Sequence, residues 1–244
     1  RFHNMKIVRY FSPNFNNKKR SKNSIKTIVI HYTGMQSERE SLKRLCNPLS
    51  KVSAHYLINQ KGKIFKLVED RHIAWHAGKS RWKKYNNLNK NSIGIELVNK
   101  GHQYGYGYFK RKQISALVKL CKILKKKYKI KTKNFLGHSD IAPLRKIDPG
   151  EKFPWEFLSI KKIGIWHDLK SNFLKKCRKL KVSKKEVKKF KKLLIRIGYF
   201  LPKDKKKSFT MTTKAFQRHF RKELINGILD KECLIIADNL AKKS

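Results

Sequence analysis

The chain has 244 residues, of which 39% are hydrophobic and 11% aromatic, a content that supports a folded core and excludes wholesale disorder. It holds 62 Lys and Arg against 16 Asp and Glu, and the formal net charge of +46 favours a polyanionic partner such as nucleic acid, anionic lipid or an acidic cell-envelope polymer. An AT-rich genome, which favours Lys, Asn and Ile codons, is an equal explanation for much of this charge.

The first 24 residues are polar and read as an extended, irregular arm. After this arm, β-branched and apolar runs predict strands at 27–32, 52–59, 64–68 and 92–98. The turn at 60–62 predicts a hairpin between the second and third of these strands. Ser37 followed by Glu40 is a capping-box pattern, so a short helix is expected there, ended by Pro48.

Between the last of these strands and residue 170 the pattern becomes helical. The Gly-Tyr repeat at 101–108 predicts a loop. A helix follows, because one apolar face recurs at Ile114, Leu117, Val118, Cys121, Leu124 and Tyr128. Strands that alternate with helices indicate an α/β fold with a mixed central β-sheet flanked by helices, and we assign residues 1–170 to this domain.

The last third of the chain is rich in lysine and has few strand signals. We expect a linker at 171–180 and a small three-helix domain at 181–244. Its first helix starts with the capping box Ser183 and Glu186 and stops at Gly198. The second is expected at 213–224, with Phe216 and Phe220 inward, and the third near Asp230, using Leu234, Ile235 and Leu240.

The cysteines and the apolar runs limit several classes of protein. None of the four cysteines forms a CxxC pair, which excludes a zinc ribbon, and Cys121 is expected in the core. No charged-then-apolar leader is present, and no apolar run approaches the roughly 20 residues of a membrane span. Helix-turn-helix, RNA-recognition and zinc-finger patterns are absent, so no specific nucleic-acid partner is expected.

Three short stretches carry the side chains of a candidate site. His31 ends the first strand, Glu96 lies inside an apolar strand, and GHSDIAPLRKIDPG (137–150) holds His138, Lys146 and Asp148. A catalytic zinc site needs three ligands of the His, Asp or Glu type, and a nearby carboxylate and cation assist hydrolysis. The alternatives remain open at this level: a water-facing Glu96, a hydrogen-bonded structural His31 and a polar surface loop.

Five blocks occur in order: IVIHYTG, VSAHYLI, AWHAG, NSIGIELVN and GHSDIAPLRKIDPG. Together they resemble the zinc-dependent N-acetylmuramoyl-L-alanine amidases of the type-2 family, the AmpD and AmiD enzymes, which are related to peptidoglycan recognition proteins. The resemblance covers residues 8–165. The early SPNFNNKKR segment favours the AmiD branch. AFQRHF and the C-terminal apolar pattern resemble its three-helix peptidoglycan-binding module, with a plain helical appendage as the alternative.

The resemblance implies a role for each residue of the candidate site. His31, His138 and Asp148 would bind one Zn²⁺ per chain, Glu96 would be the catalytic carboxylate and Lys146 would assist it. Substrate contacts are expected at four further positions: Tyr32, Trp75, His76 and Arg81. The first three side chains could instead only pack in the structure. Arg81 could simply be one of the many basic residues of the chain. His55 is expected to be structural.

The resemblance implies an enzyme that hydrolyses the amide between N-acetylmuramic acid, including anhydro-muramyl forms, and L-alanine of the peptidoglycan stem peptide. The expected partners are peptidoglycan or muropeptides, with electrostatic association with anionic envelope polymers. A non-catalytic peptidoglycan-recognition protein is the alternative. The C-terminal helices favour a location in the bacterial envelope, in the periplasm or outside the cell. The alternative is a recycling enzyme, which would be cytoplasmic.

Overall fold

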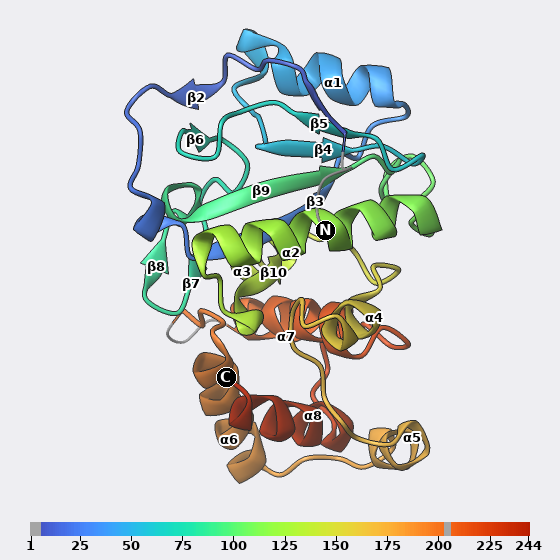
Figure 1. Cartoon of the computed structure of the whole chain (residues 1–244). Helices are drawn as coiled ribbons and strands as arrows, with labels where there is room; N and C mark the ends of the chain where they lie inside the picture. Colours follow the sequence, from blue (N-terminus) through green and yellow to red (C-terminus); the bar gives the residue numbers. More distant parts are fainter. Residues whose placement is uncertain (1–5, 203–205) are drawn as a thin grey trace.

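A six-stranded mixed sheet forms the centre of the first part of the chain in the computed structural model, which describes residues 6–202 and 206–244 (Figure 1). The strand order is β1-β5-β4-β9-β3-β10. In chain order the strands are β1 (Ile7–Arg9), β3 (Thr27–Tyr32), β4 (Tyr56–Ile58), β5 (Ile64–Lys66), β9 (Ser92–Leu97) and β10 (Phe135–Gly137). The predicted mixed sheet is confirmed.

The pairing of the strands decides where polar side chains meet. β4, β9, β3 and β10 are parallel neighbours, whereas β5 runs antiparallel to β4. Because parallel strands end at the same edge, the residues that end β3, β9 and β10 lie together. The register places His31 beside Glu96, and Gly137, the last residue of β10, beside Ile30.

Side chains of β3 alternate between two different layers. Ile28 and Ile30 pack with the apolar face of α2 (Arg111–Tyr128), whereas Val29 lies on the opposite face in a second cluster. His31 follows the alternation onto the Val29 face. Helix α1 (Glu38–Cys46) starts at Ser37, whose side chain accepts the Glu40 N–H as expected, and it packs on a third cluster around β4 and β5.

Short elements complete the first part of the chain. Two small antiparallel sheets pair β2 (Phe15–Asn16) with β6 (Ile73–Ala74) and β7 (Arg81–Trp82) with β8 (Tyr85–Asn86). Short helices α3 (His138–Ile141) and α4 (Trp155–Ile160) follow β10. The 3-10 helices are Lys22–Ser24, Pro48–Ser50, Leu88–Asn91 and Thr132–Asn134.

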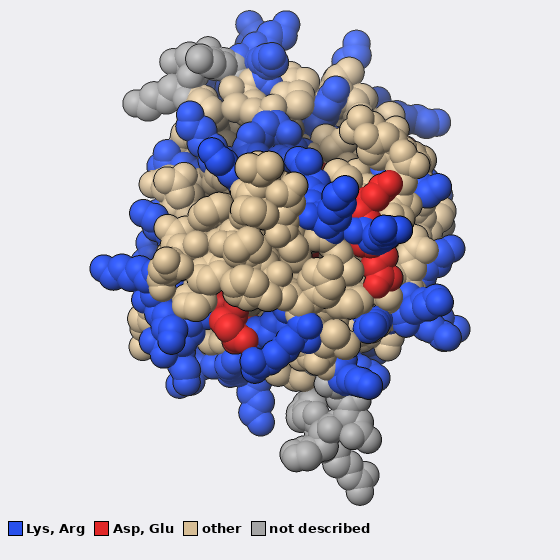
Figure 2. All heavy atoms as spheres, turned by 90° about the horizontal axis from the view of Figure 1, so that it is seen from above, with Lys and Arg blue, Asp and Glu red and all other residues tan. Residues whose placement is uncertain are grey.

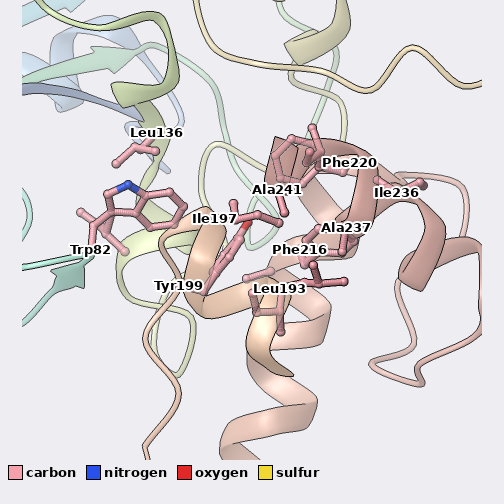
Figure 3. Close-up of a cluster of buried hydrophobic side chains, with 14 of the residues drawn as sticks. Trp82, Leu136, Leu193, Ile197, Tyr199, Phe216, Phe220, Ile236, Ala237 and Ala241 are labelled. Carbon is pink, nitrogen blue, oxygen red and sulfur yellow. The ribbon is translucent and has the colours of Figure 1, made fainter. Parts of the chain in front are cut away.

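Four helices form the C-terminal region: α5 (Ser171–Arg178), α6 (Lys184–Ile197), α7 (Lys206–Phe220) and α8 (Lys231–Lys242). One apolar cluster joins them to the first part of the chain, since Trp82 and Leu136 pack with side chains of these helices (Figure 3). Each fully buried large apolar side chain contributes about 1.5–3 kcal/mol to folding. The C-terminal helices therefore share a core with the sheet.

Several sequence-based expectations are confirmed at residue level. The 27–32 strand matches β3, and the 52–59 and 64–68 strands form the expected hairpin, although only Tyr56–Ile58 and Ile64–Lys66 are paired. The Ser183 capping box and the Asp230 N-cap begin α6 and α8, and Phe216 and Phe220 are buried. Cys121 is fully buried, and all four cysteines are free.

Other expectations need correction. Residues 6–24 are not an irregular arm, because β1 pairs with β5 and β2 pairs with β6; residues 1–5 lie outside the described residues. The 171–180 interval is mostly helix α5, since Leu174 and Cys177 are buried on one side of it. Helix α7 ends at Phe220 rather than Leu224, and Ile236 rather than Ile235 is fully buried in α8. The division into domains stays a prediction.

None of the helices within residues 6–202 and 206–244 has both the length and the apolar character needed to cross a membrane.

Candidate metal and catalytic site

Three ligand atoms converge at the edge where β3, β9 and β10 end. His31 Nδ1 lies 3.0 Å from His138 Nδ1 and 3.0 Å from Asp148 Oδ2, and His138 Nδ1 lies 3.1 Å from the same carboxylate oxygen. The three side chains come from the end of β3, the first residue of α3 and the loop that follows α3. Within the described residues they form a group that could hold a metal ion.

The partners of the His138 imidazole decide which of its nitrogens is free. Its Nε2 lies 3.1 Å from the Ala77 carbonyl oxygen, which can only accept a hydrogen bond. Arg145 Nη2, which can only donate, lies farther from Nε2, at 3.5 Å, and donates to the carbonyl oxygens of Ala77 and Lys79. The closer Ala77 contact therefore indicates that Nε2 of a neutral His138 carries the proton and that Nδ1 turns a lone pair toward His31 and Asp148.

A longer chain of hydrogen bonds orients His31 in the same way. Ser92 Oγ donates to the Leu88 carbonyl oxygen at 2.6 Å and so accepts from His76 Nε2 at 3.1 Å. His76 Nδ1 is then unprotonated and accepts from His31 Nε2 at 3.0 Å. His31 Nδ1 is left with a lone pair, which points at the same place as that of His138.

Burial and neighbouring side chains keep His31 and Asp148 in the protonation states that a metal requires. Burial, followed by the neighbouring His138, lowers the pKa of His31 to about 4. Burial and the nearby His31 also lower the pKa of His76 well below its ordinary value. Although burial alone would raise the pKa of Asp148, the adjacent His138 and His31 hold it far below the usual range. At neutral pH the site therefore presents a neutral His31 imidazole and an ionised Asp148 carboxylate.

The donor set fits zinc. Two lone pairs and a carboxylate oxygen that face one another at about 3 Å repel, and a cation between them relieves this repulsion. Zn–N and Zn–O distances near 2.0–2.2 Å in tetrahedral geometry place ligand atoms about 3.3 Å apart. The observed separations of 3.0–3.1 Å are close to this value.

A cavity of about 350 Å³ opens beside the three ligands. Its walls come from the ends of β3 and β9, from α1, from the segment around Trp75 and from the loop before Asp148. The lining residues are His31, Tyr32, Thr33, Met35, Ser41, Arg44, Leu45, Val52, Ser53, Trp75, His76, Glu96, His138, Arg145, Lys146, Ile147 and Asp148. A small molecule held here would contact the three candidate metal ligands and Glu96 together.

Glu96 is half-buried at the wall of the cavity. The residue reaches the cavity, but its Oε2 is buried without a hydrogen-bond partner among the described residues. Burial, followed by the charge of Asp148, raises the pKa of Glu96 well above its ordinary value, while Lys146 partly offsets this rise. A desolvated carboxyl beside a metal site is suited to accept and deliver a proton.

Lys146 and Arg145 bring positive charge to the cavity wall. Lys146 is half-buried, lines the cavity and influences the pKa values of both His31 and Glu96. The Arg145 guanidinium is held by the carbonyl oxygens of Ala77 and Lys79. A cation fixed in this way can stabilise negative charge that develops on a substrate.

The four predicted substrate-contact residues divide into two groups. Tyr32, Trp75 and His76 line the cavity, and His76 also orients His31. Tyr32 hydroxyl lies 2.9 Å from His102 Nδ1, and Trp75 Nε1 donates to Asn16 at 2.6 Å. Arg81 does not line this cavity, because its exposed guanidinium stacks over the Phe200 ring at 4.1 Å. The structure thus does not place Arg81 with the other site residues.

Sequence reasoning missed residues that support the site. Ser92 begins β9 and determines the tautomer of His76, and Gly94 makes room for the same ring, since a Cβ at this position would lie 2.4 Å from His76 Cγ. Arg145 and Asp140 lie in the GHSDIAPLRKIDPG stretch. Their charged side chains in this stretch were the one sequence feature that could have indicated a role at the site. His55, as expected, is structural: it is fully buried and its Nδ1 accepts the Gly94 N–H.

Convergent ligand atoms and a desolvated carboxylate at the carboxyl ends of parallel strands are typical of a metal-dependent hydrolase. The sequence profile of the N-acetylmuramoyl-L-alanine amidases matches residues 21–151. N-acetylmuramoyl-L-alanine amidase AmiD of Escherichia coli is 38% identical over 232 residues, which cover 90% of this chain and 83% of AmiD. The chain belongs to the N-acetylmuramoyl-L-alanine amidase family, as the ordered motifs predicted.

Two solved structures extend the similarity to the C-terminal helices. The complex of AmiD from E. coli with anhydro-N-acetylmuramic acid-L-Ala-D-γ-Glu-L-Lys has a TM-score of 0.82 at 36% identity and covers 93% of both chains. AmpDh3 from Pseudomonas aeruginosa in complex with anhydromuramic pentapeptide has a TM-score of 0.80 at 33% identity, covering 95% of this chain and 96% of that one. The predicted fold and the prediction of an amidase are confirmed.

Proposed function

We propose that this amidase hydrolyses the amide between N-acetylmuramic acid, including its anhydro form, and L-alanine of the stem peptide. One Zn²⁺ per chain would be held by His31, His138 and Asp148. The observation that carries the proposal is the convergence of two imidazole lone pairs and a carboxylate oxygen within 3.1 Å of one another beside Glu96. The anhydro-muramyl ligands of the AmiD and AmpDh3 structures support the substrate class.

Zinc bound at this site would supply Lewis acidity and lower the pKa of a water molecule toward neutrality. In the proposed reaction, Glu96 accepts the proton of the attacking water and delivers it to the leaving amine of L-alanine. Its unpaired Oε2 and raised pKa support this role. Lys146 stabilises the negative charge that develops on the carbonyl oxygen, as expected for a half-buried cation on the same cavity wall.

The substrate would lie along the cavity between Tyr32 and Trp75, whose rings line it. The hydrogen bonds of Tyr32 to His102 and of Trp75 to Asn16 hold both rings in place, which reduces the entropy lost on binding. His76 contributes mainly through His31. Arg81 would meet a substrate only if the stem peptide extended beyond the cavity, toward the second, apolar cavity of about 370 Å³ that Arg81 lines.

The direct test is release of stem peptide from anhydro-N-acetylmuramyl-L-Ala-D-γ-Glu-L-Lys by zinc-loaded protein, followed by mass spectrometry of both products. We expect cleavage between the muramyl lactyl group and L-alanine only. Tight binding of the same ligand without any cleavage would support the alternative, a non-catalytic peptidoglycan-recognition protein. Cleavage at another bond would contradict the assigned substrate geometry.

We further propose that the chain acts at the cell envelope, periplasmic or exported, with the helices at 181–244 binding the wall and raising the local substrate concentration. Similarity of the C-terminal region to AmiD and AmpDh3 supports this role. Co-sedimentation with purified sacculi and cell fractionation test it. Exclusive recovery in the cytoplasm would favour the recycling alternative.

The surface charge supports a role for anionic envelope polymers. Figure 2 shows Lys and Arg spread over the face seen from above, with few acidic groups between them. A separate groove of about 730 Å³ concentrates this positive charge. Seven of its nine described lining residues are lysines: Lys122, Lys125, Lys126, Lys129, Lys131, Lys161 and Lys162. Burial and the neighbouring Lys162 lower the pKa of Lys125, so an anion here would relieve repulsion.

Binding to inorganic polyphosphate at increasing salt tests this groove. The triple substitution Lys122→Glu, Lys126→Glu and Lys161→Glu should weaken binding more than a matched triple on exposed α6 positions, Lys184→Glu, Lys188→Glu and Lys192→Glu. Equal losses would mean that only the overall charge matters. Tight binding to duplex DNA at physiological salt would instead favour a nucleic-acid partner.

A further inference from the structure

A buried carboxylate connects the metal-ligand segment to the C-terminal helices. Asp140 lies two residues after His138 and is 1% exposed. Its Oδ2 accepts the Gly137 backbone N–H at 2.7 Å and lies 2.8 Å from His219 Nδ1, and its Oδ1 accepts the Tyr199 hydroxyl at 2.7 Å. Both side-chain partners come from the C-terminal region. The side-chain hydrogen bonds of this carboxylate are therefore made with residues far from it in the sequence.

The two partners of Asp140 are themselves held firmly. His219, on α7, stacks on Trp155 with ring centroids 4.1 Å apart and an interplanar angle of 14°. Tyr199 follows α6 and packs edge-to-face on Trp82 at 5.0 Å. Figure 3 shows Tyr199 between Trp82 and the side chains of the C-terminal helices. A donor pair fixed by the core can therefore hold Asp140 in one position.

The position of Asp140 affects two of the three ligands. Its bond to Gly137 N–H fixes the residue that precedes His138, at the turn from β10 into α3. The Ser139 backbone N–H donates to the Asp148 carbonyl oxygen at 2.9 Å, which ties the segment of the third ligand to α3. A shift of Asp140 would thus move His138 and Asp148 relative to His31, which is anchored separately in β3.

We propose that Tyr199 and His219 are positioning residues for the metal site, and that they act through Asp140. The C-terminal helices are then a structural part of the hydrolytic centre as well as a wall-binding module. This inference rests on the proposed metal site formed by His31, His138 and Asp148. Removing a group bonded directly to a metal ligand typically weakens metal binding 10- to 100-fold, and for residues one contact further out we expect the lower end of this range, about 10-fold.

The test compares two substitutions that each delete one buried tyrosine-to-aspartate hydrogen bond. Tyr199→Phe removes the bond to Asp140, and the control Tyr128→Phe removes the 2.6 Å bond to Asp70, which lies outside the metal cavity. Zinc affinity is measured by chelator competition in the full chain, well below the Tm of both variants. The visible spectrum of the Co²⁺-substituted protein reports the ligand geometry.

We expect about 10-fold weaker zinc binding and an altered Co²⁺ spectrum for Tyr199→Phe, and wild-type values for Tyr128→Phe. His219→Asn, which keeps an N–H near the Nδ1 position, should retain more affinity than His219→Leu. Equal zinc affinities and spectra in all variants would overturn the positioning role alone. A wild-type chain that binds no zinc would overturn the proposed metal site and this inference with it.

Discussion

His31 and Glu96 are paired residues of the neighbouring parallel strands β3 and β9. Their Cα atoms belong to strands that lie about 4.8 Å apart, and side chains at paired positions project to the same face of a sheet. The separation between His31 and the carboxyl group of Glu96 is therefore set by backbone hydrogen bonds of the central sheet. This arrangement makes Glu96 the first residue to test.

Substitution Glu96→Gln removes the proton acceptor and keeps the size of the side chain. We expect kcat for muramyl-peptide hydrolysis to fall about 100- to 10,000-fold, since this is the usual contribution of a general acid–base group. Zinc content, measured by atomic emission, should not change, because Glu96 is not among the three ligands. The exposed Glu156→Gln serves as control. Near-normal turnover by Glu96→Gln would exclude its catalytic role.

Zinc removal should destabilise the folded chain, because two lone pairs and a carboxylate then repel without a cation between them. Zinc at 1,000 times its Kd stabilises the native state by about 4 kcal/mol. For a chain of this size that corresponds to a Tm change of about 8–16 °C. Differential scanning calorimetry with chelator, and again after zinc is restored, measures the shift.

The variant His138→Ala, which lacks one ligand, provides the control for this measurement. Its Tm should respond little to zinc, whereas His167→Ala, at a half-buried histidine outside the cavity, should respond as the wild type does. A zinc response of normal size in His138→Ala would assign the metal to another place.

Substitution Ser92→Ala tests the hydrogen-bond chain that orients His31. Without the Ser92 hydroxyl, His76 Nε2 loses its acceptor, so the tautomer that leaves His31 Nδ1 free is less favoured. Zinc affinity should fall about 10-fold. Ser159→Ala, whose hydroxyl bonds only to the Glu156 carbonyl oxygen in the described structure, is the matched control. Unchanged affinity in Ser92→Ala would show that the chain does not select the tautomer.

His55 should make stability depend on pH outside the metal site. Burial, then the charge of Arg20, lowers the pKa of His55 to about 3, whereas an unfolded histidine titrates near 6.5. Between these values the unfolded chain binds the additional proton. Stability is therefore complete above about pH 6.5 and falls by about 1.4 kcal/mol per pH unit as the pH drops toward 3.

Urea unfolding at pH 7, 6 and 5 measures this slope, with chelator present so that metal binding does not contribute. His55→Gln cannot take up this proton, and its slope should be smaller by the amount that one group contributes. Parallel slopes for the two proteins would show that His55 is protonated equally in the folded and unfolded chains.

Sequence patterns predicted those elements whose stability depends on interactions between residues close together in the chain. The run of β-branched residues at 27–32 predicted β3, and the Ser37 and Glu40 pair predicted the start of α1, because a capping box satisfies backbone donors within a few residues. Lysines between the apolar positions concealed α5, where the fold buries only Leu174 and Cys177. Strand β1 has only three residues, too few for an alternating pattern to predict it. It forms because it pairs with β5, which lies far along the chain.

The amino-acid sequence by itself determined the kind of chemistry: ordered motifs supplied the residue types of a zinc amidase and named His31, Glu96, His138, Lys146 and Asp148. Only the tertiary structure decided that three ligand atoms converge, that Arg81 lies apart from them, and that Asp140 is held by Tyr199 and His219. Distances between side chains depend on strand register and on packing between segments distant in sequence, and no local pattern encodes either.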